Sequence, residues 1–95
     1  MVVHLVSFKY RKDVDDAARQ DHRARLKALA DIDGVIDFKV GPDFVRSPRS
    51  YDTGIVVQFR DRAALDGYAT HPRHLPVAQL GRDLSDSIVA VDFDA

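Results

Sequence analysis

The stretch VVHLVSFKY, at Val2–Tyr10, decides the fold because it carries apolar side chains on both of its faces. Branched and aromatic residues alternate along it with a period of two, which predicts a β-strand. One face presents Val2, His4, Val6, Phe8 and Tyr10, and the other presents Val3, Leu5, Ser7 and Lys9. A strand of this composition needs an apolar cover on each side of its sheet.

The residues that follow predict a helix, a turn and a second strand. From Val14 to Ala30 the apolar side chains recur with the period of an amphipathic helix, and Asp13 is its expected N-cap. Asp33-Gly34 has the chemistry of a turn and ends this helical region. Val35 to Val40 then predicts the second strand of the sheet.

The rest of the chain adds two strands and a second helical region. A loop is expected from Pro42 to Ser50, followed by a strand from Tyr51 to Arg60. The last strand is expected from Ser87 to Asp92 or Phe93. Asp61 is the expected N-cap of a short helix. This helix should end near His71, because a residue that precedes a proline is disfavoured in the helical region. A further helical piece is expected from about His74 to Arg82.

The order of elements is strand, helix, strand, strand, helix, strand, which predicts a ferredoxin-like fold of the α+β class. In this βαββαβ arrangement both helical regions cover one face of a four-stranded antiparallel sheet. We expect residues 1–95 to form a single domain. Since the strands are apolar on both faces, we expect a second copy to cover the open face and form a two-fold homodimer.

Composition excludes several classes of protein. The formal net charge is −1 and the basic residues are interleaved with acidic ones, so no nucleic-acid partner is expected. No apolar run approaches the length of a membrane span, and the N-terminus lacks the features of a signal peptide. The absence of cysteine excludes disulfides, thiolate nucleophiles and cysteine metal sites. We therefore expect a soluble, cytoplasmic domain with no membrane partner.

The candidate chemistry lies in Tyr68-Ala69-Thr70-His71-Pro72-Arg73-His74, which places one phenol and two imidazoles in a single bend between helices. Imidazole exchanges protons near neutral pH. We predict a small pocket between sheet and helices in which His74 removes a proton α to a carbonyl. Tyr68 would donate a hydrogen bond to the developing enolate oxygen. The predicted substrate contacts are His4, Val6, Phe8 and His71.

Several segments together resemble the stress-responsive A/B barrel domain (Dabb) family of the dimeric α/β-barrel superfamily. They are Val3-His4-Leu5-Val6-Ser7-Phe8-Lys9, Phe38-Lys39-Val40-Gly41, Val56-Val57-Gln58-Phe59, Tyr68 with His71-Pro72 and His74, and Val91-Asp92-Phe93. The resemblance covers essentially the whole chain. It implies a homodimer whose facing sheets form a barrel-like core.

One plant branch of this family consists of polyketide cyclases of the olivetolic acid type. These enzymes close a linear poly-β-keto thioester by an intramolecular aldol condensation, with a tyrosine and a histidine as the acid–base pair. The resemblance implies these two roles for Tyr68 and His74, with His4 also facing the cavity.

Each candidate side chain also has a structural interpretation. Tyr68, His74 and His4 could be interior residues whose polar atoms bond to the backbone, and His71 could meet the negative end of a helix dipole. His71 and His74 could bind a metal, but the proline between them disturbs the spacing and no third ligand is indicated. We therefore predict no metal and no cofactor. His22, on the apolar stripe of the first helix, is predicted to be structural.

The sequence leaves three hypotheses about the function. The leading hypothesis is a homodimer with a small hydrophobic pocket for cofactor-independent acid–base chemistry, of aldol, cyclase or isomerase type, on a small carbonyl compound. A non-catalytic stress-response or ligand-binding module would use the same cavity. A cofactor-free monooxygenase of the related dimeric barrels is the third hypothesis.

Overall fold

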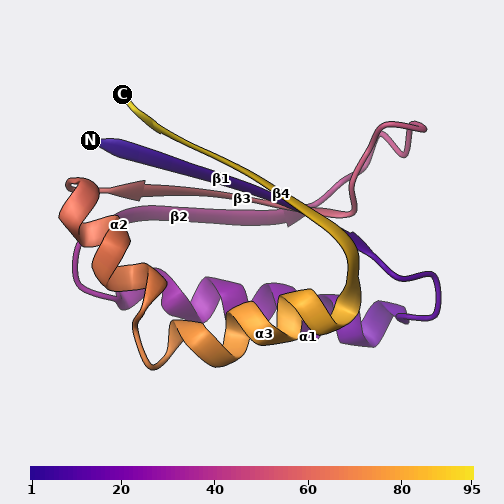
Figure 1. Ribbon diagram of the computed structural model, residues 1–95. Helices are drawn as coiled ribbons and strands as arrows, with labels where there is room; N and C mark the ends of the chain where they lie inside the picture. Colours follow the sequence, from indigo (N-terminus) through magenta and orange to yellow (C-terminus); the bar gives the residue numbers. More distant parts are fainter.

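The computed structural model describes all residues, 1–95, as one antiparallel sheet with its helices on a single face (Figure 1). The elements in chain order are β1 (Val2–Tyr10), α1 (Asp16–Lys27), a 3-10 turn η1 (Ala28–Asp31), β2 (Val35–Pro42), β3 (Thr53–Phe59), α2 (Arg62–Ala69), α3 (His74–Leu84) and β4 (Ser85–Asp94). The strand order is β2-β3-β1-β4. The predicted ferredoxin-like fold is confirmed.

Strand β1 lies in the middle of the sheet and sets the two faces of its neighbours. Val6 is opposite Ile55 of β3 and Ala90 of β4, whereas Leu5 is opposite Val56 and Val91. Because side chains alternate along a strand, the first set faces the helices and the second set faces the other side. The alternation in the sequence of β1 therefore determines which residues of the whole sheet can meet the helices.

The hydrophobic core fills the space between the sheet and the helices. Its largest fully buried side chains include Tyr68 of α2 and Phe59 of β3. Leu26 of α1 and Leu29 of η1 close it from the helical layer, at 4% and 2% exposure. Helices α1 and α3 run side by side across this face, and α2 lies at one end (Figure 1).

Helix α1 begins later than its sequence predicts. Asp15, not Asp13, caps it, because the Asp15 carboxylate accepts a hydrogen bond from the Ala18 amide at 2.9 Å. Val14 lies in a turn before the helix, in which its amide donates to the Arg11 carbonyl at 3.1 Å, and its side chain is buried in the core. Val14 thus fits the apolar period that predicts the helix and packs in the core, but it lies outside the helix.

The start of β3 also differs from the expected one. Strand β3 begins at Thr53, and Tyr51 lies outside it, with its hydroxyl bonded to Ser87 Oγ at 2.8 Å. The buried Asp52 carboxylate accepts from the Tyr10 amide at 2.8 Å and from Arg46 at 2.7 Å. Burial acts to raise the pKa of Asp52, but these two hydrogen bonds and the positive charges of Arg19 and Arg46 outweigh it and lower the pKa below its ordinary value.

The face of the sheet away from the helices is apolar and exposed. Along β4, Val89, Val91 and Phe93 are 50%, 59% and 44% exposed, and Val56 of β3 adds to the same surface. This face lies uppermost in Figure 1, with no helix over it. The structure thus leaves a strip of branched and aromatic side chains facing outward. None of the helices has the length and apolar character to cross a membrane.

Candidate functional site

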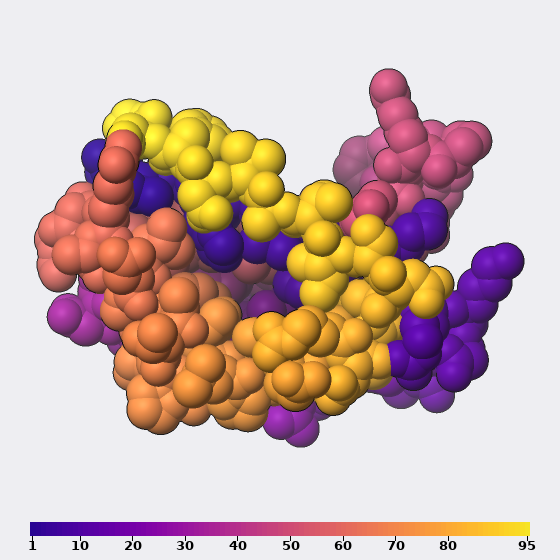
Figure 2. Space-filling model, viewed as in Figure 1, coloured from indigo at the N-terminus to yellow at the C-terminus, as the bar shows by residue number.

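A cavity of about 220 Å³ lies between β1, β4 and the helices. Figure 2 shows the molecule hollowed between β4 and the two helices α2 and α3, with atoms of the N-terminal strand in the depth. Nine of its twelve lining residues are hydrophobic. The full lining is His4, Val6, Phe8, Leu26, Ile55, Tyr68, His74, Val77, Ala78, Arg82, Ile88 and Ala90.

Five of the six residues predicted for the site line this cavity: Tyr68, His74, His4, Val6 and Phe8. The alternation of β1 brings His4, Val6 and Phe8 to the helix side of the sheet. Tyr68 sits in the last turn of α2, and His74 is the first residue of α3. The bend at Pro72 therefore brings the phenol and the imidazole together although they belong to different helices.

His74 is half-buried, and its backbone contact decides which ring nitrogen holds the proton. Its Nδ1 lies 3.1 Å from the carbonyl oxygen of Ala69. A carbonyl can only accept, so the neutral ring carries its proton on Nδ1 and its lone pair on Nε2. Burial lowers the pKa of His74 below its ordinary value; the bond to Ala69 opposes this, and the charges of His4 and Arg82 add to the lowering. At neutral pH His74 is an uncharged base.

Tyr68 is suited to donate a hydrogen bond rather than to lose its proton. It is 2% exposed, and its ring centroid lies 4.3 Å from that of His74 and 5.0 Å from that of Phe59. Burial raises the pKa of Tyr68 to about 12, with no hydrogen bond from a neighbouring group contributing. The phenol is therefore protonated throughout the physiological range, with its hydroxyl free for a ligand.

His4 is held from the opposite side by a carboxylate that the sequence analysis did not identify. His4 Nδ1 pairs with a carboxylate oxygen of Asp92, the residue directly opposite it on β4. The His4 side chain is 16% exposed and that of Asp92 is 43% exposed, so the pair connects the cavity with the surface. An acidic residue at this position of an apolar strand was the available signal, but its partner depended on the β1–β4 register.

His71 is not among the residues that line the cavity. Its Nδ1 accepts a hydrogen bond from the Arg73 amide at 3.0 Å, and its carbonyl accepts from the amides of His74 and Leu75 at 2.9 and 3.1 Å. These bonds stabilise the bend that precedes α3. His71 thus shapes the connection that positions His74.

Arg82 of α3 also lines the cavity, and the sequence analysis did not identify it. Its guanidinium donates to Gln79 Oε1 at 3.0 Å, and Gln79 Nε2 in turn donates to Asp83 at 2.8 Å. Arg82 forms no ion pair within the chain, although ten such pairs are present elsewhere. The positive charge at the cavity is therefore not neutralised by a direct contact.

His22 belongs to a separate buried network. It is fully buried, and its Nδ1 lies 2.7 Å from the Tyr10 hydroxyl, which donates to Thr53 Oγ1 at 2.9 Å. His22 Nε2 has no hydrogen-bond partner. Burial lowers the pKa of His22 to about 4, so the ring is neutral at physiological pH. His22 does not line the cavity, which fits the predicted structural role.

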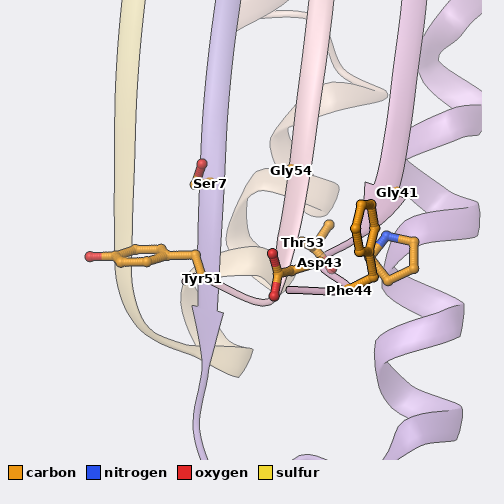
Figure 3. Close-up of a pocket in the computed structure, with 8 residues that line it drawn as sticks. Ser7, Gly41, Asp43, Phe44, Tyr51, Thr53 and Gly54 are labelled. Carbon is orange, nitrogen blue, oxygen red and sulfur yellow. The ribbon is translucent and has the colours of Figure 1, made fainter. Parts of the chain in front are cut away.

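A second hollow lies on the open face of the sheet, beside the loop from residue 43 to 52. Its floor is formed by Ser7, Gly54 and Gly41, which are paired neighbours on three strands. Figure 3 shows Tyr51 directed toward β4 and Phe44 beside Gly41. Only two of its eight lining residues are hydrophobic, and its one carboxylate, Asp43, already bonds to Arg46. The cavity on the helix side is therefore the better candidate site.

Metal-ligating side chains do not gather anywhere in the fold. No group of three histidine or aspartate side chains has the geometry of a metal site, and the sequence contains no glutamate. At the cavity, His4 and His74 each use Nδ1 in a hydrogen bond within the chain. The Nε2 atoms of the two rings are therefore the imidazole nitrogens left for other contacts.

Comparisons with known proteins place the chain within a group of similar sequences. The profile of the family described as "Stress responsive A/B Barrel Domain" matches residues 2–95. A stress-response A/B barrel domain-containing protein of Arabidopsis thaliana is 28% identical over 97 residues. This alignment covers 100% of the chain but only 37% of the Arabidopsis protein, so the chain spans little more than a third of that relative.

Two solved structures show the fold in other organisms. A protein from Jannaschia sp. CCS1, described as a dimeric ferredoxin-like protein of unknown function, is 30% identical, with a TM-score of 0.83. The match covers 99% of this chain and 98% of that one. A hydroxynitrile lyase from Passiflora edulis superimposes with a TM-score of 0.86 at 18% identity, over 97% of this chain and 90% of that one. At that identity the likeness shows the fold alone.

Proposed function

The chain belongs to the stress-responsive A/B barrel domain family, and from this premise we propose that it catalyses proton transfer on a small carbonyl compound. The proposed catalytic residues are His74 as general base and Tyr68 as hydrogen-bond donor, in one cavity per subunit of a homodimer. The observation that carries the proposal is the bond from His74 Nδ1 to the Ala69 carbonyl, which leaves Nε2 as the basic nitrogen beside a protonated phenol.

The proposed reaction starts with transfer of a proton from the carbon next to the carbonyl to His74 Nε2. The electron pair of the broken C–H bond forms an enolate, and the Tyr68 hydroxyl donates a hydrogen bond to its oxygen. Return of the proton to a carbon atom completes an isomerisation. Attack of the enolate carbon on a second carbonyl forms an alkoxide, and transfer of the proton from His74 Nε2 to this oxygen completes an aldol reaction. Neither route requires a cofactor.

His4 and Asp92 have a positioning role in this proposal. The Asp92 carboxylate accepts the Nδ1 proton of His4, so the free Nε2 of that ring is the atom left for a ligand or a water molecule. Asp92 is half-exposed, which offers a route for protons between the cavity and the solvent. The apolar remainder of the lining gives the reacting carbon surroundings of low polarity, which strengthens the hydrogen bond to the enolate.

The homodimer in this proposal forms through the open face of the sheet. An exposed apolar strip along β4 is the kind of surface that a partner covers. The Jannaschia protein, 30% identical over nearly the whole chain, is described as dimeric. A second copy would bury the strip on both chains at once, because a two-fold axis brings the same surface of each together.

The test is exchange of the α-protons of pentane-2,4-dione with deuterated solvent, followed by NMR. The wild-type protein should accelerate this exchange. His74→Ala should slow the enzymatic rate by about 10²–10⁴-fold, and Tyr68→Phe by about 10²–10³-fold. Leu75→Ala is the matched control, since Leu75 follows His74 on α3 but is 52% exposed and does not line the cavity. An unchanged rate in His74→Ala would refute the assignment of the base.

A non-catalytic ligand-binding module is the second candidate, favoured by the predominance of apolar residues in the cavity lining. Binding requires the cavity but not a basic nitrogen. A protein of this kind would bind pentane-2,4-dione without accelerating its exchange, and His74→Ala would leave the affinity nearly unchanged. A protein that loses turnover in His74→Ala while retaining affinity is instead an enzyme.

A further inference from the structure

The charge of the cavity points to the class of its ligand, and the inference rests on the proposed function. Three polar side chains, His4, His74 and Arg82, line the cavity together with the hydroxyl of Tyr68, whose ring counts among the nine hydrophobic lining residues. No carboxylate is among the lining residues. With His74 neutral and Tyr68 protonated, the permanent charge is the Arg82 guanidinium. The Asp92 carboxylate lies outside the lining and is paired with His4 Nδ1, so the unpaired charge at this mostly apolar cavity is the positive one of Arg82, which is complementary to a small anion.

The surroundings of Arg82 leave its guanidinium available. Of its five N–H donors, one is used by Gln79 Oε1, a neutral acceptor. Asp83, the adjacent acidic residue on α3, accepts from Gln79 Nε2 and does not pair with Arg82. Gln79 therefore orients the guanidinium without neutralising it. The remaining donors can form the paired hydrogen bonds that a carboxylate accepts from arginine.

The position of Arg82 relative to the acid–base pair limits the length of the ligand. Arg82 is eight residues after His74, which corresponds to about 12 Å along a helix. Its bond to Gln79 shows that the side chain reaches back toward the start of α3, which shortens this separation. Two hydrogen bonds of about 2.9 Å and a chain of about four carbon–carbon bonds, as in 5-oxohexanoate, fit within this shortened separation.

We propose that the cavity binds small keto acids, with the carboxylate held by Arg82 and the ketone carbonyl placed between Tyr68 and His74. The volume of about 220 Å³ lies below the usual range for drug-sized ligands, about 300–1,000 Å³, so the carbon chain is short. Val77 and Ala78, between His74 and Arg82 on the same helix, line the path of that chain. Arg82 is then the residue that selects acids over neutral ketones.

The experiment compares 5-oxohexanoate with its methyl ester, which has the same ketone but no charge. Affinity is measured by NMR titration of the full chain, and catalysis by deuterium exchange next to the ketone. The wild-type protein should bind the acid about tenfold or more tightly than the ester. Arg82→Gln should abolish this preference by weakening acid binding alone, and Arg82→Lys should retain part of it. Arg25→Gln, which changes a 60% exposed arginine on α1, should keep the full preference.

The outcomes separate this inference from the proposed function. Equal affinity for acid and ester in the wild-type protein overturns the inference, and so does a preference that survives in Arg82→Gln. If exchange of the ester remains fast and depends on His74 in either case, the proposed function still stands. If the acid is preferred through Arg82 but neither compound exchanges, the ligand class stands and catalysis does not.

Discussion

At the scale of single residues, the half-buried His74 and the fully buried His22 illustrate how different surroundings give one type of side chain different roles. His74 has a backbone carbonyl on one ring nitrogen and a cavity beside it, so a basic nitrogen is presented where a ligand fits. His22 has a phenol on one nitrogen, and the α3 backbone at Gly81 packs against the other. Burial lowers the pKa of both rings, but only His74 can use its lone pair for chemistry.

The lowered pKa of His74 predicts the pH dependence of the proposed reaction. A general base is active when deprotonated, so the rate should be constant at neutral pH and fall as the pH drops through the pKa of His74. Because that pKa lies below its ordinary value of about 6.5, the midpoint in a profile of kcat/KM against pH should also lie below about 6.5. A midpoint above this value would contradict the assignment. The Leu75→Ala variant should give the same profile as the wild-type protein.

His22 predicts a loss of stability in mild acid. Its pKa is about 4 in the folded protein and about 6.5 in the unfolded chain, so the unfolded chain binds a proton first as the pH falls. The stabilisation is fully present above about pH 6.5 and is lost between there and about pH 4, by roughly 3 kcal/mol. Urea unfolding at pH 7.0, 5.5 and 4.5 measures it. The comparison variant His22→Gln should show a flatter dependence; an equally steep one would assign the effect to other groups.

At the scale of elements, the close approach of α2 to the turn before β2 depends on a glycine. Gly34 has a φ of +91°, and a Cβ placed on it would lie 2.5 Å from Ala64 Cβ of α2. Arg60 N–H also donates to the Gly34 carbonyl at 2.9 Å, which joins this turn to the end of β3. Asp61 then caps α2 at the Ala64 amide. The turn, the strand end and the helix start are therefore one packed unit at the Tyr68 end of the cavity.

Two glycines near this unit provide a matched pair of substitutions. Gly34→Ala should destabilise the protein by about 2–3 kcal/mol, because it adds both backbone strain and a steric clash. Gly67→Ala, within α2 and with no atom near the added Cβ, should stabilise it by about 0.5–1 kcal/mol through helix propensity. Chemical denaturation measures both changes. Equal effects of the two variants would rule out the packing account of Gly34.

At the scale of the whole molecule, the sheet separates a face that carries the helices and holds the cavity from an open face that is apolar but uncovered. Leu5 and Val91 are opposite each other in the register and belong to the open face, whereas Val6 and Ala90 belong to the cavity side. The proposed assembly and the proposed chemistry thus use opposite faces of the same two strands. A substitution on one face of the sheet can therefore be tested without changing the contacts of side chains on the other face.

The proposed homodimer predicts a specific response to charge on the open face. Val91→Glu places a carboxylate in the middle of the exposed strip, where burial against a second copy would cost several kcal/mol. Light scattering at micromolar concentration should show a dimer for the wild-type protein and a monomer for this variant, both folded by circular dichroism. Leu75→Glu, at a similarly exposed position in the helical layer, should remain dimeric. A monomeric wild-type protein would refute the proposed assembly.

The sequence determined the features that depend on local periodicity. Alternation along β1 assigns His4, Val6 and Phe8 to one face, and the proline at position 72 places a bend between Tyr68 and His74. These patterns repeat every two residues or act on the neighbouring residue, so the chain itself carries them. The ferredoxin-like order of elements follows from the same patterns.

Only the tertiary structure decided which distant residues meet. Asp92 reaches His4 because of the β1–β4 register, and Arg82 joins the cavity because α3 lies across the sheet. His71, which is three residues before His74, lies outside the lining, although the sequence analysis counts it among the predicted substrate contacts. Strand register and helix packing are set by contacts between residues far apart in the chain, and no local period encodes them.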